Sequence, residues 1–167
     1  AAAMNAREEG EAQAQHEGGM ALHYASKNSF PYNKKLAQSL FRAWLNDGLH
    51  ADRDMLVESL HATKEALQHI ESTIDIEVWM QLARCQQFLG MNAASLITLK
   101  QIILRFPHNP KLIATTELTM AMIYKMLKQY SLSCDLLKEC ITHAKQGLLV
   151  YTELDIMFLL SRVYELW

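Results

Sequence analysis

The apolar and small residues of this chain recur at helical spacing in short segments, and glycine or proline ends each segment. Two sets show this spacing between positions 79 and 107: Trp79, Leu82 and Ala83, followed by Ser95, Leu99 and Ile102. Steps of three and four residues place side chains on one face of an α-helix. Gly90 separates the two sets and Pro107 follows the second, as expected at helix ends. The spacing therefore predicts two short helices joined by a tight turn, which must pack as an antiparallel pair.

The composition favours helices throughout the chain. Half of the 167 residues are hydrophobic and a fifth are charged, with only six Gly and three Pro. Leu, Ala, Met, Gln, Lys and Glu lose little side-chain freedom in a helix. No segment shows the alternation of a strand, so we expect an all-α protein. The net charge of −2 and the pI near 6.4 argue against a general binder of nucleic acid or anionic membranes.

Two regions differ in character. Residues 1–29 are polar and nearly free of apolar anchors, so we expect them to be mostly disordered, with Ala1–Ala3 as an expression scar. Residues 30–167 are expected to form one helical-repeat domain. Capping residues predict where its helices begin, at Asn33, Asp54, Asp75, Asn92, Asn109, Ser131 and Thr152.

The stretch from Trp79 to Pro107 resembles the tetratricopeptide (TPR) repeat. That consensus reads W-x2-L-G-x2-Y, then A-x3-F-x2-A, then P. The chain matches it at every class of position except the tyrosine, which is Gln86 here; the matches are Trp79, Leu82, Ala83, Ser95, Leu99, Ile102 and Pro107. The resemblance implies antiparallel helical pairs stacked as a short right-handed superhelix. In each pair a small residue on the first helix lets a small residue of the second approach closely.

Further repeats appear when the other helices are aligned on Ala83. The equivalent positions are Phe41, Ala121 and Ser161, at steps of 42, 38 and 40 residues. These steps exceed the usual repeat of about 34 residues. We therefore expect elongated, degenerate repeats, in a chain that is a fragment of a longer array. A plain helical bundle, or HEAT-like pairs with chance matches, is the alternative.

The resemblance also implies a binding surface, because the first helices of TPR pairs line a concave groove. The consensus positions give candidate partner-binding residues in four repeats: Gln38, Arg42, Glu77, Met80, Arg84, Gln87, Leu118, Met122, Lys125, Phe158 and Arg162. One position is arginine in three repeats: Arg42, Arg84 and Arg162. Guanidinium groups suit carboxylates or phosphates, and the apolar residues between them suit adaptable side-chain contacts. Alternatively, these arginines are solvated, with their stems packed on neighbouring residues.

The last predicted helix is apolar on nearly every side, and no second helix follows to cover it. A terminal helix of a repeat array normally has one polar face. Either the array continues, or this helix meets another chain through Leu154, Leu159, Val163, Leu166 and Trp167.

The sequence contains no recognisable catalytic or metal-binding motif. Cys85, Cys134 and Cys140 have no ligand-like spacing with each other or with histidine, so we expect reduced, mostly buried thiols. His61 and His69 share a helix without a third ligand. No glycine-rich phosphate loop and no GxSxG motif occurs. We therefore expect no cofactor, no metal and no enzymatic activity, in a soluble protein of the cytoplasm or nucleus.

These features favour a protein–protein interaction scaffold within a larger complex. Its partner would be a peptide or helical segment carrying acidic and apolar residues, bound in the concave groove. One alternative is an RNA-binding helical-repeat module, in which the arginines contact phosphates. Another is a non-catalytic regulatory subunit that self-associates through its C-terminal helix. We expect no membrane partner, and the charge balance makes a nucleic-acid partner the weaker reading.

Overall fold

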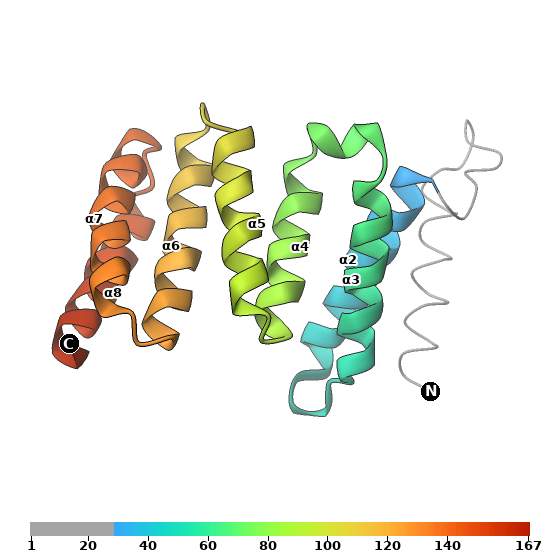
Figure 1. Ribbon diagram of the computed structural model, residues 1–167, viewed down its shortest axis with the longest axis horizontal. Helices are drawn as coiled ribbons and strands as arrows, with labels where there is room; N and C mark the ends of the chain where they lie inside the picture. Colours follow the sequence, from blue (N-terminus) through green and yellow to red (C-terminus); the bar gives the residue numbers. More distant parts are fainter. Residues whose placement is uncertain (1–28) are drawn as a thin grey trace. The chain divides into compact units, whose positions relative to one another are not determined.

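The computed structural model describes residues 29–167, except the side chains of Leu49 and of residues 150–153. The segment that we predicted to be disordered therefore lies, up to position 28, outside the described residues. The described part is helical throughout and has no strand (Figure 1), which confirms the all-α fold class. Its elements are α2 (Phe30–Asp47), η1 (Gly48–His50), α3 (Arg53–Leu67), η2 (Ile70–Thr73), α4 (Ile76–Phe88), α5 (Asn92–Arg105), α6 (Pro110–Met126), α7 (Tyr130–Gln146) and α8 (Val150–Leu166).

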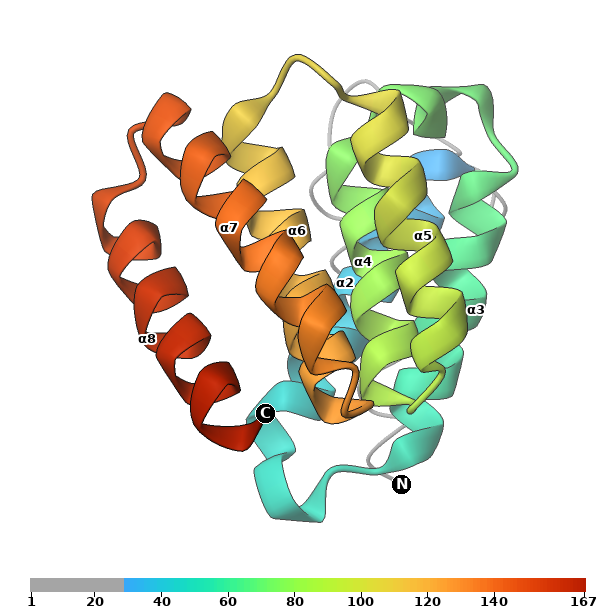
Figure 2. The ribbon, with the colours of Figure 1, turned by 60° about the vertical axis from the view of Figure 1, so that its left-hand side comes forward.

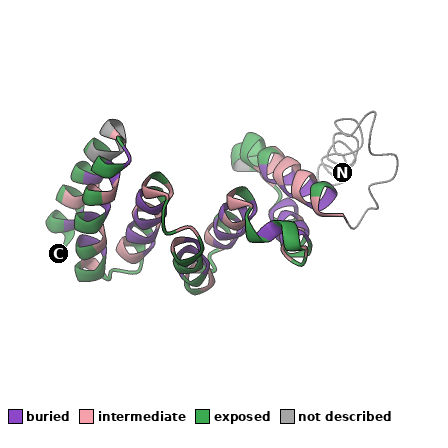
Figure 3. Cartoon of the chain, turned by 90° about the horizontal axis from the view of Figure 1, so that it is seen from above, coloured by how far each residue is buried: buried purple, intermediate pink, exposed green. Residues whose placement is uncertain are grey.

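The helices belong to two compact units, Ala1–Ser95 and Leu96–Trp167, whose boundary falls inside α5. In the first unit α2 and α3 form an antiparallel pair, and α4 packs against α3. Buried residues occupy the faces that these helices turn to one another (Figure 3). One cluster lies between α2 and α3: Tyr32, Leu36, Ala37, Leu40, Met55 and Ala62. A second cluster extends to α4: Phe41, Leu56, Leu60, Leu82 and Cys85.

In the second unit α7 packs against both α6 and α8 (Figure 2). The three helices share one core, whose buried members are Ala114, Ala121, Cys134, Leu137, Cys140, Ala144, Ile156 and Val163. Ile156 and Val163 of α8 have no exposed surface. The sequence predicts Val163 to be part of a C-terminal interface; instead it packs into this core, because it lies on the face of α8 opposite Leu154 and Phe158.

Small residues meet where paired helices approach most closely. The Ser95 hydroxyl donates a hydrogen bond to the Ala83 carbonyl at 3.0 Å, and the Ser133 hydroxyl donates one to the Ala121 carbonyl at 2.8 Å. All four residues are buried. Both pairs span twelve residues, and 38 residues separate each member of one pair from its counterpart in the other. The predicted contact of small residues is thus confirmed for these two pairs.

The α2–α3 pair makes its close approach elsewhere. Here the Ser59 hydroxyl donates to the Ala37 carbonyl at 2.7 Å, one turn before the predicted position at Phe41. Phe41 instead fills the core shared with α4. A phenylalanine is too large to sit between two closely packed helices, so the contact moves to the nearest small residue. The predicted equivalence of Phe41 with Ala83 therefore does not extend to this contact.

Candidate partner-binding groove

An open groove runs along the surface of the first unit between α2 and α4. Nine residues line it: Gln38, Phe41, Arg42 and Leu45 from α2, and Ile76, Glu77, Met80, Gln81 and Arg84 from α4. On each helix these residues recur every three or four positions, which places them on one face. The two helices run in the same direction, since Lys34 contacts Glu77 near their starts and Trp44 contacts Phe88 near their ends.

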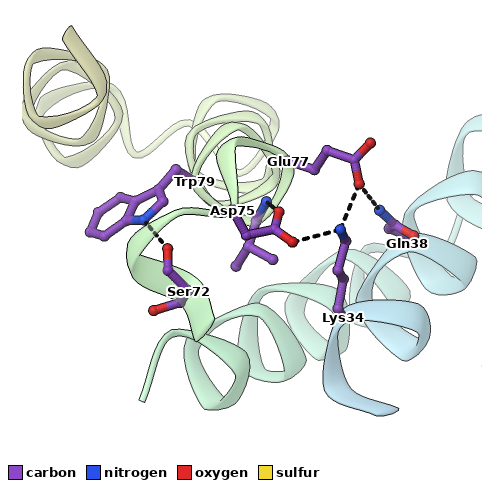
Figure 4. A network of polar contacts seen from close by, with 7 residues as sticks. Lys34, Gln38, Ser72, Asp75, Glu77 and Trp79 are labelled. Atoms are coloured by element: carbon purple, nitrogen blue, oxygen red, sulfur yellow. Dashed lines mark hydrogen bonds and ion pairs between the residues drawn. The ribbon is translucent and has the colours of Figure 1, made fainter. Parts of the chain in front are cut away.

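A polar network closes the groove near the starts of α2 and α4 (Figure 4). The Lys34 ammonium lies 2.7 Å from a carboxylate oxygen of Asp75 and 2.7 Å from one of Glu77. The Gln38 amide donates a longer hydrogen bond of 3.4 Å to the same Glu77 oxygen. Asp75 also caps α4 by accepting from the Val78 amide at 3.1 Å. One lysine of α2 thereby holds the first turn of α4 in place.

Trp79 helps to fix the start of α4. Its indole nitrogen donates to the Ser72 carbonyl at 2.9 Å, which ties α4 to the η2 turn before it (Figure 4). An indole N–H usually finds such a partner when its ring is partly buried. The tryptophan that carries the strongest sequence signature thus orients the beginning of α4, and does not line the groove itself.

The ionisation of this network follows from its contacts. Partial burial by itself would lower the pKa of Lys34, but the hydrogen bonds and charges of Asp75 and Glu77 outweigh it and raise that pKa. The hydrogen bond from Lys34 lowers the pKa of Glu77. At neutral pH Lys34 and Glu77 are therefore both charged, and the single ammonium offsets one of the two carboxylates that it contacts. Glu77 is predicted to bind a partner, but the structure shows its carboxylate already engaged by Lys34 and Gln38.

Arg42 and Arg84 line the same groove but do not take part in this network. Both side chains are exposed and line the groove, and neither forms an ion pair or a hydrogen bond with another residue in the part of the chain that is described. Counting Lys34 and the two carboxylates that it binds, the groove carries one excess positive charge. That excess lies with the two guanidinium groups, whose donors are free to bind an acceptor from outside.

Apolar side chains form the floor of the groove beside these arginines. Met80 is 9 % exposed, and Phe41 is 6 % exposed. The Phe88 ring packs against Phe41 and Trp44, with ring centroids 5.9 and 5.1 Å away. Phe88 and Leu45 each expose about half of their surface. The groove therefore offers cationic groups beside an apolar floor, ending at an exposed aromatic ring.

The structure brings together most of the predicted residues of the first unit. Gln38, Arg42, Glu77, Met80 and Arg84 all line this groove, whereas Gln87 does not. The predicted residues of the second unit have varied surroundings. Leu118 packs against the core of that unit, Lys125 is half-buried, and Met122 and Phe158 are exposed. Arg162 pairs with Glu165 of its own helix at 2.5 Å.

The residues predicted for a C-terminal interface also differ in how exposed they are. Leu154, Leu166 and Trp167 are more than half exposed, whereas Leu159 packs partly against the core. A separate hollow lies beside α8, lined by Ile141, Met157, Leu160, Ser161, Tyr164 and Glu165. Since Ile141 belongs to α7, this hollow is shared by α7 and α8, and the exposed Met157 and Tyr164 lie in it.

The three thiols are buried and free, as predicted. Burial raises the pKa of each of them, and that of Cys140 reaches about 12. The thiolate is the nucleophile and metal ligand of cysteine, so none of these groups is poised for either role. Among the described residues, no three side chains of His, Cys, Asp or Glu gather as a metal site would require.

Sequence reasoning missed Lys34 and Asp75. No candidate position falls on Lys34, and the sequence predicts Asp75 only as a helix cap. A signal was present, because Lys34, Gln38 and Arg42 step by four and so share one stripe of α2. What could not be foreseen was that the cap residue of α4, 41 positions later, would meet this stripe.

No protein-family model matches the chain, and no curated protein matches it in sequence. None of the described helices combines the length and the apolar character that crossing a membrane requires. What the groove binds is therefore inferred from its own side chains.

Proposed function

We propose that this chain is a non-catalytic protein-interaction module, built from degenerate TPR-like helical pairs, that binds a partner segment in the groove between α2 and α4. The partner carries carboxylates for Arg42 and Arg84 and apolar side chains for the floor around Phe41 and Met80. One observation carries this proposal: two exposed arginines, which form no ion pair with any residue between positions 29 and 167 that the structure describes, flank an apolar groove. Charged groups with free donors beside apolar surface are typical of peptide-binding sites.

The repeat architecture supports this reading. The small-residue contacts Ala83–Ser95 and Ala121–Ser133 recur with the same internal spacing of twelve residues. Repeated helical pairs present extended surfaces for other proteins. Three buried, unpaired thiols suit a reducing compartment, so we place the protein in the cytoplasm or the nucleus, within a larger complex.

The proposal can be tested with a displayed library of random peptides selected on the wild-type chain. We expect the selected peptides to combine Asp or Glu with Leu, Met or Phe. Affinity for such a peptide should fall about tenfold or more in the double variant Arg42→Glu/Arg84→Glu, because like charges then oppose the peptide. Lys64→Glu is the matched control, since Lys64 is exposed on α3 and does not line the groove.

Two results would contradict the proposal. The first is unchanged affinity of the double variant for the selected peptides. The second is a failure to select peptides together with binding of single-stranded RNA whose affinity falls steeply with salt, since that dependence marks phosphate contacts. Circular dichroism of each variant checks that the helices persist.

A further inference from the structure

The outer face of α8 combines exposed apolar residues with charges of both signs. Leu154 is 60 % exposed and Phe158 is 70 % exposed, and both lie on the face opposite Ile156 and Val163. Asp155 and Arg162 are exposed as well. On a helix with 3.6 residues per turn, Leu154, Phe158 and Arg162 step by four, and Asp155 lies three positions before Phe158. All four side chains therefore share one face.

The order of charges on this face suits pairing with an identical helix. Asp155 and Arg162 are seven residues apart in the sequence, and Phe158 lies between them along the helix. Both charged residues lie on the same side of the line that joins Leu154 and Phe158. When two copies of a helix pack antiparallel, like flanks meet and the sequence order is reversed. Asp155 of each copy would then face Arg162 of the other, on both sides of a central contact between the two Phe158 rings. A parallel arrangement would instead bring opposite flanks together, so it would not pair Asp155 with Arg162.

The present partners of these charges allow such pairing. Asp155 forms no ion pair with another residue that the structure describes. Arg162 contacts Glu165 of its own helix in an exposed pair, and an exposed pair of this kind contributes little to stability. A guanidinium has five N–H donors, so it can hold Glu165 and a second carboxylate together. Ser161 adds a small side chain beside Phe158, which lets the two helices approach.

We propose that the chain forms a symmetric dimer in which α8 packs antiparallel on α8 of a second copy, with Asp155 of each copy paired to Arg162 of the other. The charge complementarity of this face with itself selects a second copy over an unrelated partner. A contact made by one helix of 17 residues from each copy is small, so the dimer is of the weak, transient class. The residues of this surface belong to the second unit, and none of them lines the groove between α2 and α4 of the first unit.

The test is the oligomeric state of the full chain, measured by sedimentation across a dilution series. We expect reversible dimerisation by the wild type. Phe158→Glu should abolish it, and Asp155→Arg or Arg162→Asp should each raise the dissociation constant about tenfold or more, because each variant faces two like-charge contacts. The double variant Asp155→Arg/Arg162→Asp restores both pairs with the charges exchanged, so it should regain affinity relative to both single variants, although the exchange removes the contact of Arg162 with Glu165.

Lys128→Glu is the matched control, since it reverses one exposed charge outside α8 and should leave dimerisation unchanged. Circular dichroism of each variant separates loss of association from loss of folding. The proposal is overturned by a wild type that stays monomeric at the highest concentration reached, or by a dimer that Phe158→Glu leaves intact. It is equally overturned if the charge exchange fails to restore a dimer that both single reversals weaken.

Discussion

At the scale of single residues, the second unit carries one buried acid whose ionisation is coupled to packing. Glu117 of α6 is 4 % exposed, and its carboxylate lies 2.8 Å from Nδ1 of His143 on α7. Burial raises the pKa of Glu117, and the charge of Glu139 adds to this rise, while His143 opposes it. The folded chain therefore holds the proton of Glu117 more tightly than the unfolded chain does.

The sign of the resulting pH dependence follows from linkage. Because its pKa is raised in the folded state, protonated Glu117 stabilises the fold, and this contribution is fully present at pH values below the ordinary glutamate pKa of about 4.3. That contribution is lost as the pH rises through the raised value. Glu117→Gln cannot ionise, so its free energy of unfolding should increase relative to the wild type as the pH rises across this window. Urea unfolding of both proteins at a series of pH values measures the difference.

Glu71→Gln serves as the control for this series, because Glu71 is an exposed glutamate of η2 in the other unit. Its difference from the wild type should stay nearly constant over the same pH range. A Glu117→Gln variant that loses stability relative to the wild type with rising pH would show that the bond to His143 outweighs the cost of burial.

At the scale of elements, three helices end in the same turn although their sequences differ there. After α4, α6 and α7 the backbone enters the left-handed region at Gly90, Lys128 and Leu148, with φ of 77, 59 and 56°. In each turn the next amide bonds a carbonyl five residues back: Met91 to Gln86, Gln129 to Tyr124 and Leu149 to Ala144. This is the Schellman motif, in which glycine is favoured because it has no Cβ. Only the first turn has glycine at that position.

The shared turn predicts opposite effects of two substitutions. Leu148 is 85 % exposed, so Leu148→Gly relieves left-handed strain while losing little packing. We expect it to stabilise the chain by roughly 0.5–1 kcal/mol, whereas Gly90→Leu should destabilise it by about 1–2 kcal/mol. Leu148→Ala is the control, because alanine keeps the Cβ and should show no comparable gain. Thermal unfolding compares the three variants, and destabilisation by Leu148→Gly would contradict the expectation.

The predicted helix starts can be compared with the observed ones to see where capping residues locate a helix correctly. Asp75 and Asn109 do cap their helices, accepting from Val78 and Leu112, and α5 begins at Asn92. The start predicted at Asn33 is wrong, because Ser29 caps α2 and Phe30 and Pro31 form its first turn. The starts at Asp54 and Ser131 are also displaced, to Asp52 and Gln129, and α8 begins at Val150, before Thr152. Neither Gln129 nor Leu149 caps its helix with its side chain, so the starts of α7 and α8 are not set by side-chain capping.

At the scale of the whole molecule, each unit has its own buried clusters. Those of the first unit draw on α2, α3 and α4, and that of the second on α6, α7 and α8. In helical-repeat proteins stability is approximately a sum of local terms. A defect placed in one unit should therefore act mainly on the helices of that unit.

Ala121→Leu tests this expectation, because Ala121 has no exposed surface and accepts the Ser133 hydrogen bond. Three additional carbon atoms at this contact should cost about 1–3 kcal/mol. Hydrogen exchange should show lost protection in α6, α7 and α8, with smaller changes in α2 and α3. The control is Met122→Leu at the exposed neighbouring position. Equal loss of protection in both units would show that the chain unfolds as one cooperative body.

Local sequence patterns were sufficient to predict the helical pairs, their ends near Gly90 and Pro107, and the small residues Ala83 and Ala121, each of which contacts a serine of its paired helix. These features depend on backbone geometry and on side-chain size at fixed short spacing, both of which can be read locally. Three features became apparent only in the folded chain: Ala37 makes the contact predicted at Phe41, Val163 is buried, and Lys34 pairs with Asp75 and Glu77 beside the groove arginines. Such contacts join residues tens of positions apart, and they depend on how whole helices pack rather than on any one helix.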